Sequence, residues 1–353
     1  MVQKLLNSIN SLLITNPTNI RYVTGFEGSA PEEREAYVLL TKKQTFLFTN
    51  SLYREKTKTL KGVTVVEISR EEPFARKLAE ALTGPGPVNR LGFEENNLTV
   101  AEYHKIMEVH KNVMLVPTQG RVEELRMIKR EDEIENIRKA AKITDECFEF
   151  ILKKIKPGIN ESEIAWEIEA FIRARSAQLA FSPIVAFGKN TSQPHYKTSD
   201  VGLRTSDIIL VDFGARVNGY CSDMTRTVFV GKPEDEWKRA YETVLTAQQK
   251  ALGYLTGPGP VTSRADKIAR KVIQNTGFPT YPHSHGHGVG LDIHEAPRLT
   301  VKKDQILKPN MVITVEPGIY IEGQYGVRLE DLILLKEDGI EIVSKSNKEM
   351  IIL

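Results

Sequence analysis

Four of the seven histidines of this chain lie within residues 283–294, and four isolated acidic residues surround that cluster in the sequence. Asp212 and Asp223 come before it, in a β-rich segment. Glu316 and Glu330 come after it, each in an apolar, β-rich run. Carboxylates together with imidazole are the ligands that hard and borderline divalent cations prefer. This combination is typical of metal-dependent hydrolases.

A β-hairpin is expected to position the two aspartates. The dipeptide at 218–219 is Asn-Gly between two β-rich runs, which is the strongest short signal for a two-residue hairpin turn. Such a turn places Asp212 opposite Thr225 and Asp223 opposite Gly214. Because side chains alternate along a strand, both aspartates share one face as diagonal neighbours, roughly 7–8 Å apart at the backbone.

Two carboxylates at that range repel each other unless a cation lies between them. The apolar residues before Asp212 indicate burial, which makes an unpaired carboxylate more costly. The alternatives are that each aspartate forms an ion pair with Arg216 or Arg226, or that the register of the hairpin slips. The hairpin by itself favours neither interpretation.

The histidine cluster and the glutamates extend the pattern. His287 lies between two glycines, which let a neighbouring strand or a ligand approach closely. Glu316 ends an apolar run, and Glu330 lies inside the strand predicted at 327–335. An acidic residue in such a strand is costly unless it is paired, and Glu330 alone would pair with Arg328. Four carboxylates and one imidazole together instead favour a two-metal centre.

The remaining patterns predict two domains with a boundary around residues 120–125. The first 120 residues alternate strands and helices, whereas the second half begins with long helical patterns. The charge run at 129–133 is typical of a solvated helix face. The predicted elements are a hairpin at 36–49, a strand at 63–68, helices at 73–82, 100–109 (capped by Thr99), 122–155 and 161–177, and the strands of the 208–230 hairpin.

Composition narrows the function classes. A chain of 353 residues suits two domains, and its net charge of +2 has no basic stripe, so nothing favours nucleic-acid binding. Cys147 and Cys221 are too few for a disulfide framework. No run reaches the roughly 18 apolar residues of a membrane span. We therefore expect a cytoplasmic, soluble protein with no membrane or nucleic-acid partner.

The motifs around these residues resemble those of the Xaa-Pro peptidases of the pita-bread metallopeptidase family, peptidase family M24, which includes prolidase and aminopeptidase P. Residues 20–26 and 28–30 extend the resemblance to essentially the whole chain. The resemblance implies an α+β fold, with a smaller α/β creatinase-like N-terminal domain at 1–122 and a pita-bread (creatinase/aminopeptidase-like) catalytic domain at 123–353. The motifs that carry it are at 212–215, 221–227, 286–291, 294–297, 316–320 and 328–331.

The same resemblance implies the site. It assigns two divalent metal ions that bridge a water molecule and lower its pKa, so that hydroxide attacks the carbonyl group before proline. His195 and His294 match histidines that contact the substrate and the tetrahedral intermediate, and Glu316 matches the carboxylate that handles the proton. Mn, Co, Zn or Fe would each suit such ligands. The implied metal ligands are Asp212, Asp223, His287, Glu316 and Glu330.

Substrate length separates two alternatives. Arg298 matches an arginine suited to the free carboxylate of a dipeptide, which favours an Xaa-Pro dipeptidase. An Xaa-Pro aminopeptidase acting on longer peptides is the runner-up. A non-catalytic binding protein on this fold would have lost a metal ligand, and none is lost; a homodimer is expected from the family. Tyr196, which could narrow the cleft, and the segment 50–53 depart from the family pattern and bear on substrate range.

Overall fold

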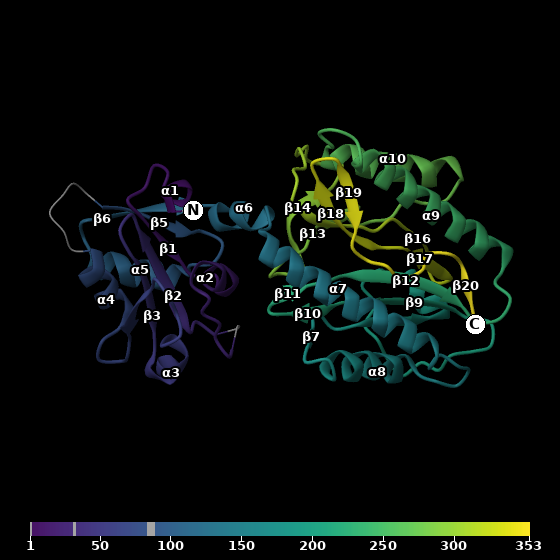
Figure 1. Cartoon of the computed structure of the whole chain (residues 1–353), viewed down its shortest axis with the longest axis horizontal. Coiled ribbons are helices and arrows are strands. Elements are labelled where there is room, and N and C mark those ends of the chain that lie inside the picture. Colours follow the sequence, from purple (N-terminus) through teal and green to yellow (C-terminus); the bar gives the residue numbers. More distant parts are fainter. Residues whose placement is uncertain (1, 31–32, 83–88) are drawn as a thin grey trace. The chain divides into compact units, whose positions relative to one another are not determined.

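The computed structural model describes residues 2–30, 33–82 and 89–353. The chain divides into two compact units, Met1–Arg126 and Met127–Leu353. Each unit has its own strands and helices (Figure 1). Each also has its own hydrophobic core.

The N-terminal unit is built on one six-stranded sheet in the order β4-β3-β2-β1-β5-β6. The predicted hairpin is confirmed, with Leu40 of β2 opposite Thr45 of β3. Its strands are β1 (Ser11–Ile14), β2 (Ala36–Thr41), β3 (Thr45–Thr49), β4 (Thr64–Glu67), β5 (Asn89–Glu94) and β6 (Val113–Thr118). Its helices are α1 (Val2–Leu5), α2 (Pro17–Thr24), η1 (Ser51–Tyr53), α3 (Arg54–Thr57), α4 (Phe74–Leu82), α5 (Val100–Val109) and α6 (Arg121–Met127).

Both faces of this sheet are covered, which explains why its central strands are apolar throughout. Leu12 of β1 belongs to the core cluster that includes α1 and α2, and the adjacent Leu13 belongs to the cluster that includes α4 and α5. Successive side chains of a strand point to opposite faces, so each face needs its own layer of helices. The predicted cap of α5 is also confirmed, because Thr99 and Glu102 form a capping box.

The helix predicted at 122–155 was wrong in its continuity, because the chain breaks between α6 and α7 (Glu131–Leu152). The backbone of Arg130 is extended rather than helical. Lys129, just before it, donates its backbone N–H to the carbonyl of Asn310, and its Nζ lies 2.6 Å from Oε1 of Glu295. These two distant partners draw Lys129 out of the helical path.

The same contacts correct the interpretation of the charge run at 129–133. Lys129 and Glu133 are both buried, at 2% exposure each, so the run is a solvated face only in part. The helix predicted at 161–177 is also shorter than expected, since α8 ends at Arg173.

The second unit contains four sheets, in the orders β11-β10-β7, β20-β12-β9-β8, β14-β13-β15-β18-β19 and β16-β17. Its helices are α7, α8 (Glu161–Arg173), η2 (Gly188–Ser192), α9 (Asp235–Leu255) and α10 (Thr262–Asn275). Its strands are β7 (Gln178–Leu179), β8 (Ile184–Phe187), β9 (Ile208–Phe213), β10 (Ala215–Val217), β11 (Tyr220–Cys221), β12 (Met224–Phe229), β13 (Gly286–Gly288), β14 (Glu295–Leu299), β15 (Val312–Val315), β16 (Gly318–Ile321), β17 (Tyr325–Arg328), β18 (Asp331–Lys336), β19 (Gly339–Ile342) and β20 (Ile351–Ile352).

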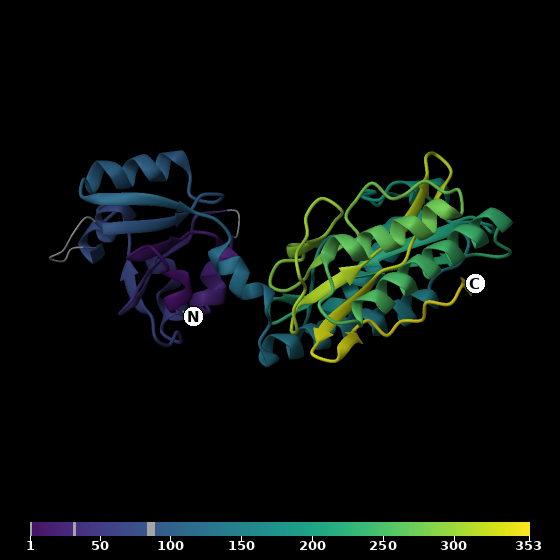
Figure 2. The same cartoon turned by 90° about the horizontal axis from the view of Figure 1, so that it is seen from above.

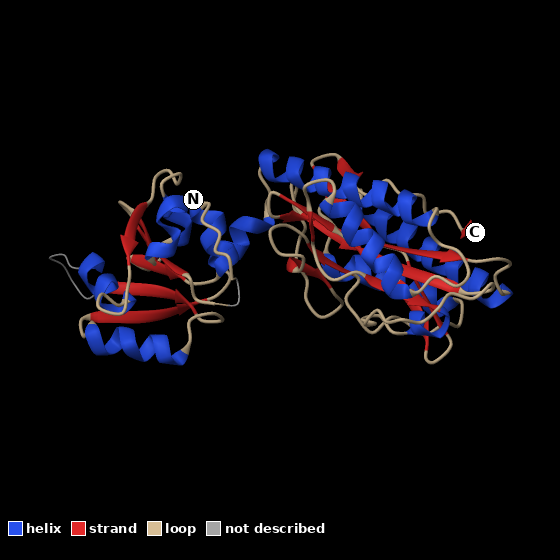
Figure 3. Ribbon diagram, turned by 90° about the horizontal axis from the view of Figure 1, so that it is seen from below, coloured by secondary structure: helices blue, strands red, loops and turns tan. Residues whose placement is uncertain are grey.

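Two pairs of helices pack on these strands. Phe148 of α7 and Ile164 of α8 share a core cluster with Val211 of β9, whereas Val244 of α9 shares another with Ile313 of β15. Figures 1 and 2 show these helices running beside the strands. Figure 3 shows that both units combine helices with strands. Within the described part of the chain, no helix has the combined length and apolar character that crossing a membrane requires.

Candidate metal centre

The predicted register of the aspartate hairpin is confirmed. Asp212 of β9 lies opposite Thr225 of β12, and Asp223 directly precedes β12. The turn at Asn218-Gly219 has positive φ at both residues, 48° and 85°, as a type I′ turn requires. The hairpin changes sheets at Gly214, where a Cβ atom would lie 1.8 Å from the carbonyl oxygen of Ser222. Glycine is therefore required at 214 to keep the two strands close.

The glycines on either side of His287 have the predicted role of close approach. A Cβ atom on Gly286 would lie 2.0 Å from the carbonyl oxygen of Thr314, and one on Gly288 would lie 2.2 Å from that of Ala296. Strand β13 thus fits between β14 and β15 only because its two glycines have no side chain.

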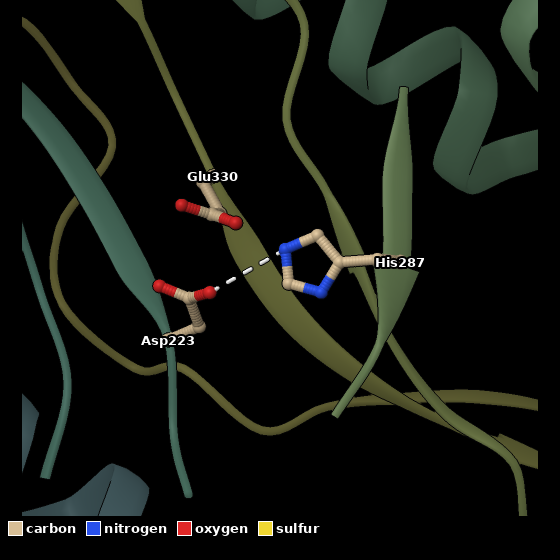
Figure 4. Close-up of side chains that lie close together, drawn as sticks. All are labelled: Asp223, His287 and Glu330. Atoms are coloured by element: carbon tan, nitrogen blue, oxygen red, sulfur yellow. Dashed lines mark ion pairs between the residues drawn. The ribbon is translucent and has the colours of Figure 1, made fainter. Parts of the chain in front are cut away.

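Three side chains from distant parts of the sequence converge at one point. Asp223, His287 and Glu330 each offer a ligand atom, and these atoms all lie within 4.8 Å of one another. Figure 4 shows the three groups pointing toward a common space. His287 Nε2 lies 3.5 Å from Oδ2 of Asp223 and 3.5 Å from Oε1 of Glu316, so the fourth residue joins the same cluster.

The two glutamates occupy breaks between strands. Glu316 follows β15, and its backbone N–H donates to the carbonyl of His285. Glu330 lies between β17 and β18, so the single strand predicted at 327–335 is interrupted at Glu330 itself. The side-chain hydroxyl of Thr225 donates to Oε2 of Glu330 at 2.7 Å.

Asp212 is the fourth carboxylate near this cluster, and an arginine side chain binds it. Arg328 Nη2 lies 2.5 Å from Oδ2 of Asp212, whereas Arg226 pairs with Asp331. Oδ1 of Asp212 is buried and has no hydrogen-bond partner among the described residues. Because a buried carboxylate oxygen without a partner is costly, this atom is free for a ligand.

Burial raises the pKa of all four carboxyl groups, and neighbouring carboxylates raise it further in Asp223, Glu316 and Glu330. The pKa of Asp223 is well above its usual range because of burial and then because Glu330, Asp212 and Glu316 are near. The pKa of Glu316 is likewise well above its usual range because of burial and then Glu330. Burial and Asp212 raise the pKa of Glu330 to about 7, and burial raises that of Asp212 although Arg328 opposes the change.

His287 has the form that a metal ligand requires. Its Nδ1 lies 3.1 Å from the backbone carbonyl of Gly288, which can only accept, so Nδ1 carries the proton. Burial lowers the pKa of this imidazole to about 3, and its unprotonated Nε2 faces Asp223 and Glu316. A backbone carbonyl that fixes the tautomer is the usual companion of a ligating histidine. The donor set therefore fits divalent cations.

A pocket of about 410 Å³ brings the remaining predicted residues to this cluster. His195, His294 and Arg298 line it, and the rings of His294 and His287 are 4.4 Å apart, edge to face. The residues that line it are Phe181, Ile184, Pro194, His195, Asp212, Asp223, His283, Ser284, His287, Ile293, His294, Arg298, Glu316, Arg328 and Glu330. All eight residues that the sequence singled out for the site are thus together.

Tyr196, expected to narrow the cleft, lies outside the lining of this pocket and lines a neighbouring one. Its hydroxyl group donates instead to the carboxylate of Glu161. The segment 50–53, the other departure, forms η1 in the N-terminal unit.

Tyr320 and His283 were given no role from the sequence, and Arg328 was considered only as a partner of Glu330, whereas it pairs with Asp212. The Tyr320 hydroxyl accepts from Nη1 of Arg328 at 3.0 Å and lies 3.0 Å from Nε2 of His283. A period of two places Arg328 on the same side of its segment as Glu330, which was a usable signal. Tyr320 stands four residues after Glu316 and gave no comparable signal.

The comparisons with known proteins agree with this geometry. Residues 135–337, more than half of the chain, match the model of metallopeptidase family M24, and residues 6–128 match the creatinase/prolidase N-terminal domain. The chain is 40% identical over 348 residues to the uncharacterized peptidase YqhT of Bacillus subtilis, covering 98% of this chain and 96% of that protein. It is 34% identical over 352 residues to an Xaa-Pro dipeptidase of Pyrococcus furiosus, again covering 98% and 96%.

Solved structures show the same similarity. An Xaa-Pro dipeptidase from Bacillus anthracis superposes with a TM-score of 0.93 at 38% identity, covering 100% of this chain and 99% of that one. An X-Pro aminopeptidase from Thermotoga maritima gives 0.90 at 32% identity, with the same coverage. The chain therefore belongs to metallopeptidase family M24, and the predicted α+β fold with a pita-bread catalytic domain is confirmed.

Proposed function

We propose that this member of family M24 is a metal-dependent Xaa-Pro dipeptidase. The observation that carries the proposal is the convergence of four carboxylates and one neutral imidazole in a pocket that His195, His294 and Arg298 also line. Relatives and structural neighbours that are Xaa-Pro dipeptidases support the substrate class. We also propose that residues 1–122 form the N-terminal domain and residues 123–353 the catalytic domain, and that the protein is a homodimer.

We assign Asp212, Asp223, His287, Glu316 and Glu330 as ligands of two divalent ions. Charge supports two ions rather than one. Four carboxylates and the Arg328 guanidinium leave three negative charges, which one divalent ion would not balance and two would slightly exceed. When bound, such ions lower the pKa of a water molecule to near neutrality and polarise a carbonyl oxygen. Ligands of this type admit Mn, Co, Zn or Fe.

The protein side chains then orient the substrate and move protons. The side chain of Glu316 is 14% exposed, more than that of the other three carboxylates. Glu316 takes a proton from the attacking water. The same carboxyl group delivers it to the proline nitrogen, which has no N–H in the peptide and must be protonated to leave. The oxygen of the water adds to the carbonyl carbon, and the C–N bond of the resulting tetrahedral intermediate then breaks. His294, beside His287, donates to the developing oxyanion, and His195 holds the substrate from the pocket wall.

Arg298 carries the preference for dipeptides. It lies opposite His287 in the register of β13 and β14, and it is exposed in the pocket. A guanidinium group binds a carboxylate through two parallel hydrogen bonds, so it recognises a substrate whose C-terminus is one residue beyond the scissile bond. An Xaa-Pro aminopeptidase is the second candidate, because the Thermotoga maritima enzyme is also similar along its full length.

The test is hydrolysis of Ala-Pro, Met-Pro and Ala-Pro-Ala by metal-stripped protein resupplied with Mn²⁺ or Co²⁺. Cleavage of the dipeptides alone is expected. Cleavage of the tripeptide as well would move the assignment to an aminopeptidase. If none of the three peptides is cleaved while metal is bound, the proposed function is refuted. Metal analysis of the active protein tests the two-ion stoichiometry, and sedimentation tests the dimer.

A further inference from the structure

A buried carboxylate outside the pocket has a network that the reaction does not use. Glu161, the first residue of α8, is 0% exposed. Its Oε1 accepts from the backbone N–H of Phe187 and from Asn190 Nδ2, both at 2.8 Å. Its Oε2 accepts from the hydroxyl of Tyr196 at 2.9 Å, and Ser199 donates to it through both its backbone N–H and its hydroxyl, at 3.2 and 2.9 Å.

The donors share one location in the chain, because they all lie between residues 187 and 199. This segment follows β8, contains the short η2 helix and then has no regular secondary structure through Tyr196. Among the described residues, none of the hydrogen-bond partners of Glu161 is a cation. Burying a carboxylate with only neutral donors is costly unless they satisfy it fully, so its position is tightly defined.

His195 lies in the middle of this segment. The residue after it, Tyr196, is held by Glu161, and the hydroxyl of Tyr196 also accepts from Asn190 at 2.9 Å. The residue before it, Pro194, is held by its carbonyl oxygen, which accepts from Nη1 of Arg328 at 3.1 Å. The His195 ring itself has no hydrogen-bond partner within the described part of the chain, so its backbone sets its place in the pocket.

We propose that Glu161 and Tyr196 are positioning residues that hold His195 against the substrate. The proposal rests on the proposed function, in which His195 contacts the peptide. It also explains why a tyrosine follows His195: its hydroxyl reaches away from the metal pocket to a buried anchor. The phenol is a donor at every relevant pH, because burial and the Glu161 carboxylate raise the pKa of Tyr196.

The test is a double-mutant cycle on kcat/KM for Ala-Pro with metal-loaded protein. Tyr196→Phe removes only the hydroxyl and leaves Glu161 four donors. We expect kcat/KM to fall about 10- to 100-fold, the range that a displacement of about 1 Å produces. In a His195→Ala background the same substitution should change kcat/KM less than about twofold, because residues that act through one another are not additive. An equal loss in both backgrounds, or no loss in either, would overturn the proposal.

Tyr220→Phe is the matched control. It removes a tyrosine–carboxylate hydrogen bond of the same kind, from Tyr220 to Oε1 of Glu133 at 2.8 Å, elsewhere in the same unit. Its kcat/KM should stay at the wild-type value. An equal loss in this control would show that general loosening, rather than His195, accounts for the effect.

A crystal structure of the Tyr196→Phe variant gives a readout that does not depend on activity. His195 should be displaced or poorly ordered while the metal ligands stay in place. An unchanged position of His195 in the variant would overturn the positioning proposal, whether or not the wild-type protein is active. A wild-type protein that cleaves no Xaa-Pro peptide would refute the proposed function. The two failures are therefore distinguishable.

Discussion

Replacing Glu330 by glutamine should stabilise the metal-free protein at alkaline pH while abolishing metal-dependent activity. Glu330 is buried among three other carboxylates, and the substitution removes one of the four negative charges. The glutamine keeps an amide oxygen that can accept from the Thr225 hydroxyl, as Glu330 does at 2.7 Å. The change therefore isolates the cost of holding this charge without a cation.

The magnitude follows from the pKa of Glu330, which burial and Asp212 raise from 4.5 to about 7. A carboxyl group with a raised pKa binds more protons in the folded than in the unfolded state, so folding stability falls as pH rises. No penalty exists below pH 4.5, and it is complete above about pH 7. At about 1.4 kcal/mol per pKa unit the full penalty is about 3 kcal/mol, or about 6–12 °C in Tm for a domain of this size.

The assay is thermal unfolding of chelator-treated wild type and Glu330→Gln at pH 4.5 and pH 8. The variant should gain stability only at pH 8, and added Mn²⁺ should raise the Tm of the wild type far more than that of the variant. Glu133→Gln is the control, because Glu133 is equally buried but bonds to Tyr220 and pairs with Arg130. It should be destabilised at both pH values. A metal-free Glu330→Gln that is less stable than wild type at pH 8 would refute the reasoning.

Three further outcomes follow from named contacts. Arg298→Ala should raise KM for Ala-Pro about 10- to 100-fold in steady-state kinetics, since the dipeptide places its carboxylate at this guanidinium, and an unchanged KM would contradict the assignment. Lys129→Met should cost about 3–5 kcal/mol in urea unfolding, because it removes one member of a buried ion pair in which Lys129 Nζ lies 2.6 Å from Oε1 of Glu295, and adding Glu295→Gln should restore part of the loss. Arg138 and then Lys336 lower the pKa of Glu341 to about 2. The stabilisation that the ionised Glu341 provides is therefore complete above pH 4.5 and lost as pH falls toward 2. In Glu341→Gln the midpoint of urea unfolding should depend less on pH over that acid range.

Features that depend only on residues close together in the sequence could be predicted. The hairpin register follows from a two-residue turn in which both residues have positive φ. Asp212 and Thr225 could therefore be paired from the sequence alone. The role of the glycines beside His287 is likewise local, because a missing side chain can be seen in the sequence. The break at residues 128–130 could not be predicted, since the buried partner of Lys129 is Glu295, 166 residues away.

The choice of arginine at Asp212 shows most clearly what the sequence left open. Arg216 and Arg226 are nearer in the chain and share its hairpin, yet Arg226 is taken by Asp331 and the guanidinium that reaches Asp212 comes from Arg328, 116 residues away. Alternation already placed Arg328 beside Glu330, but only the fold brings β9 and β17 together. Arg328 offsets one carboxylate of four, so it orients Asp212 without neutralising the cluster. The negative charge that remains when all four carboxyl groups are ionised, rather than any single ligand, is what favours cations at the proposed metal site.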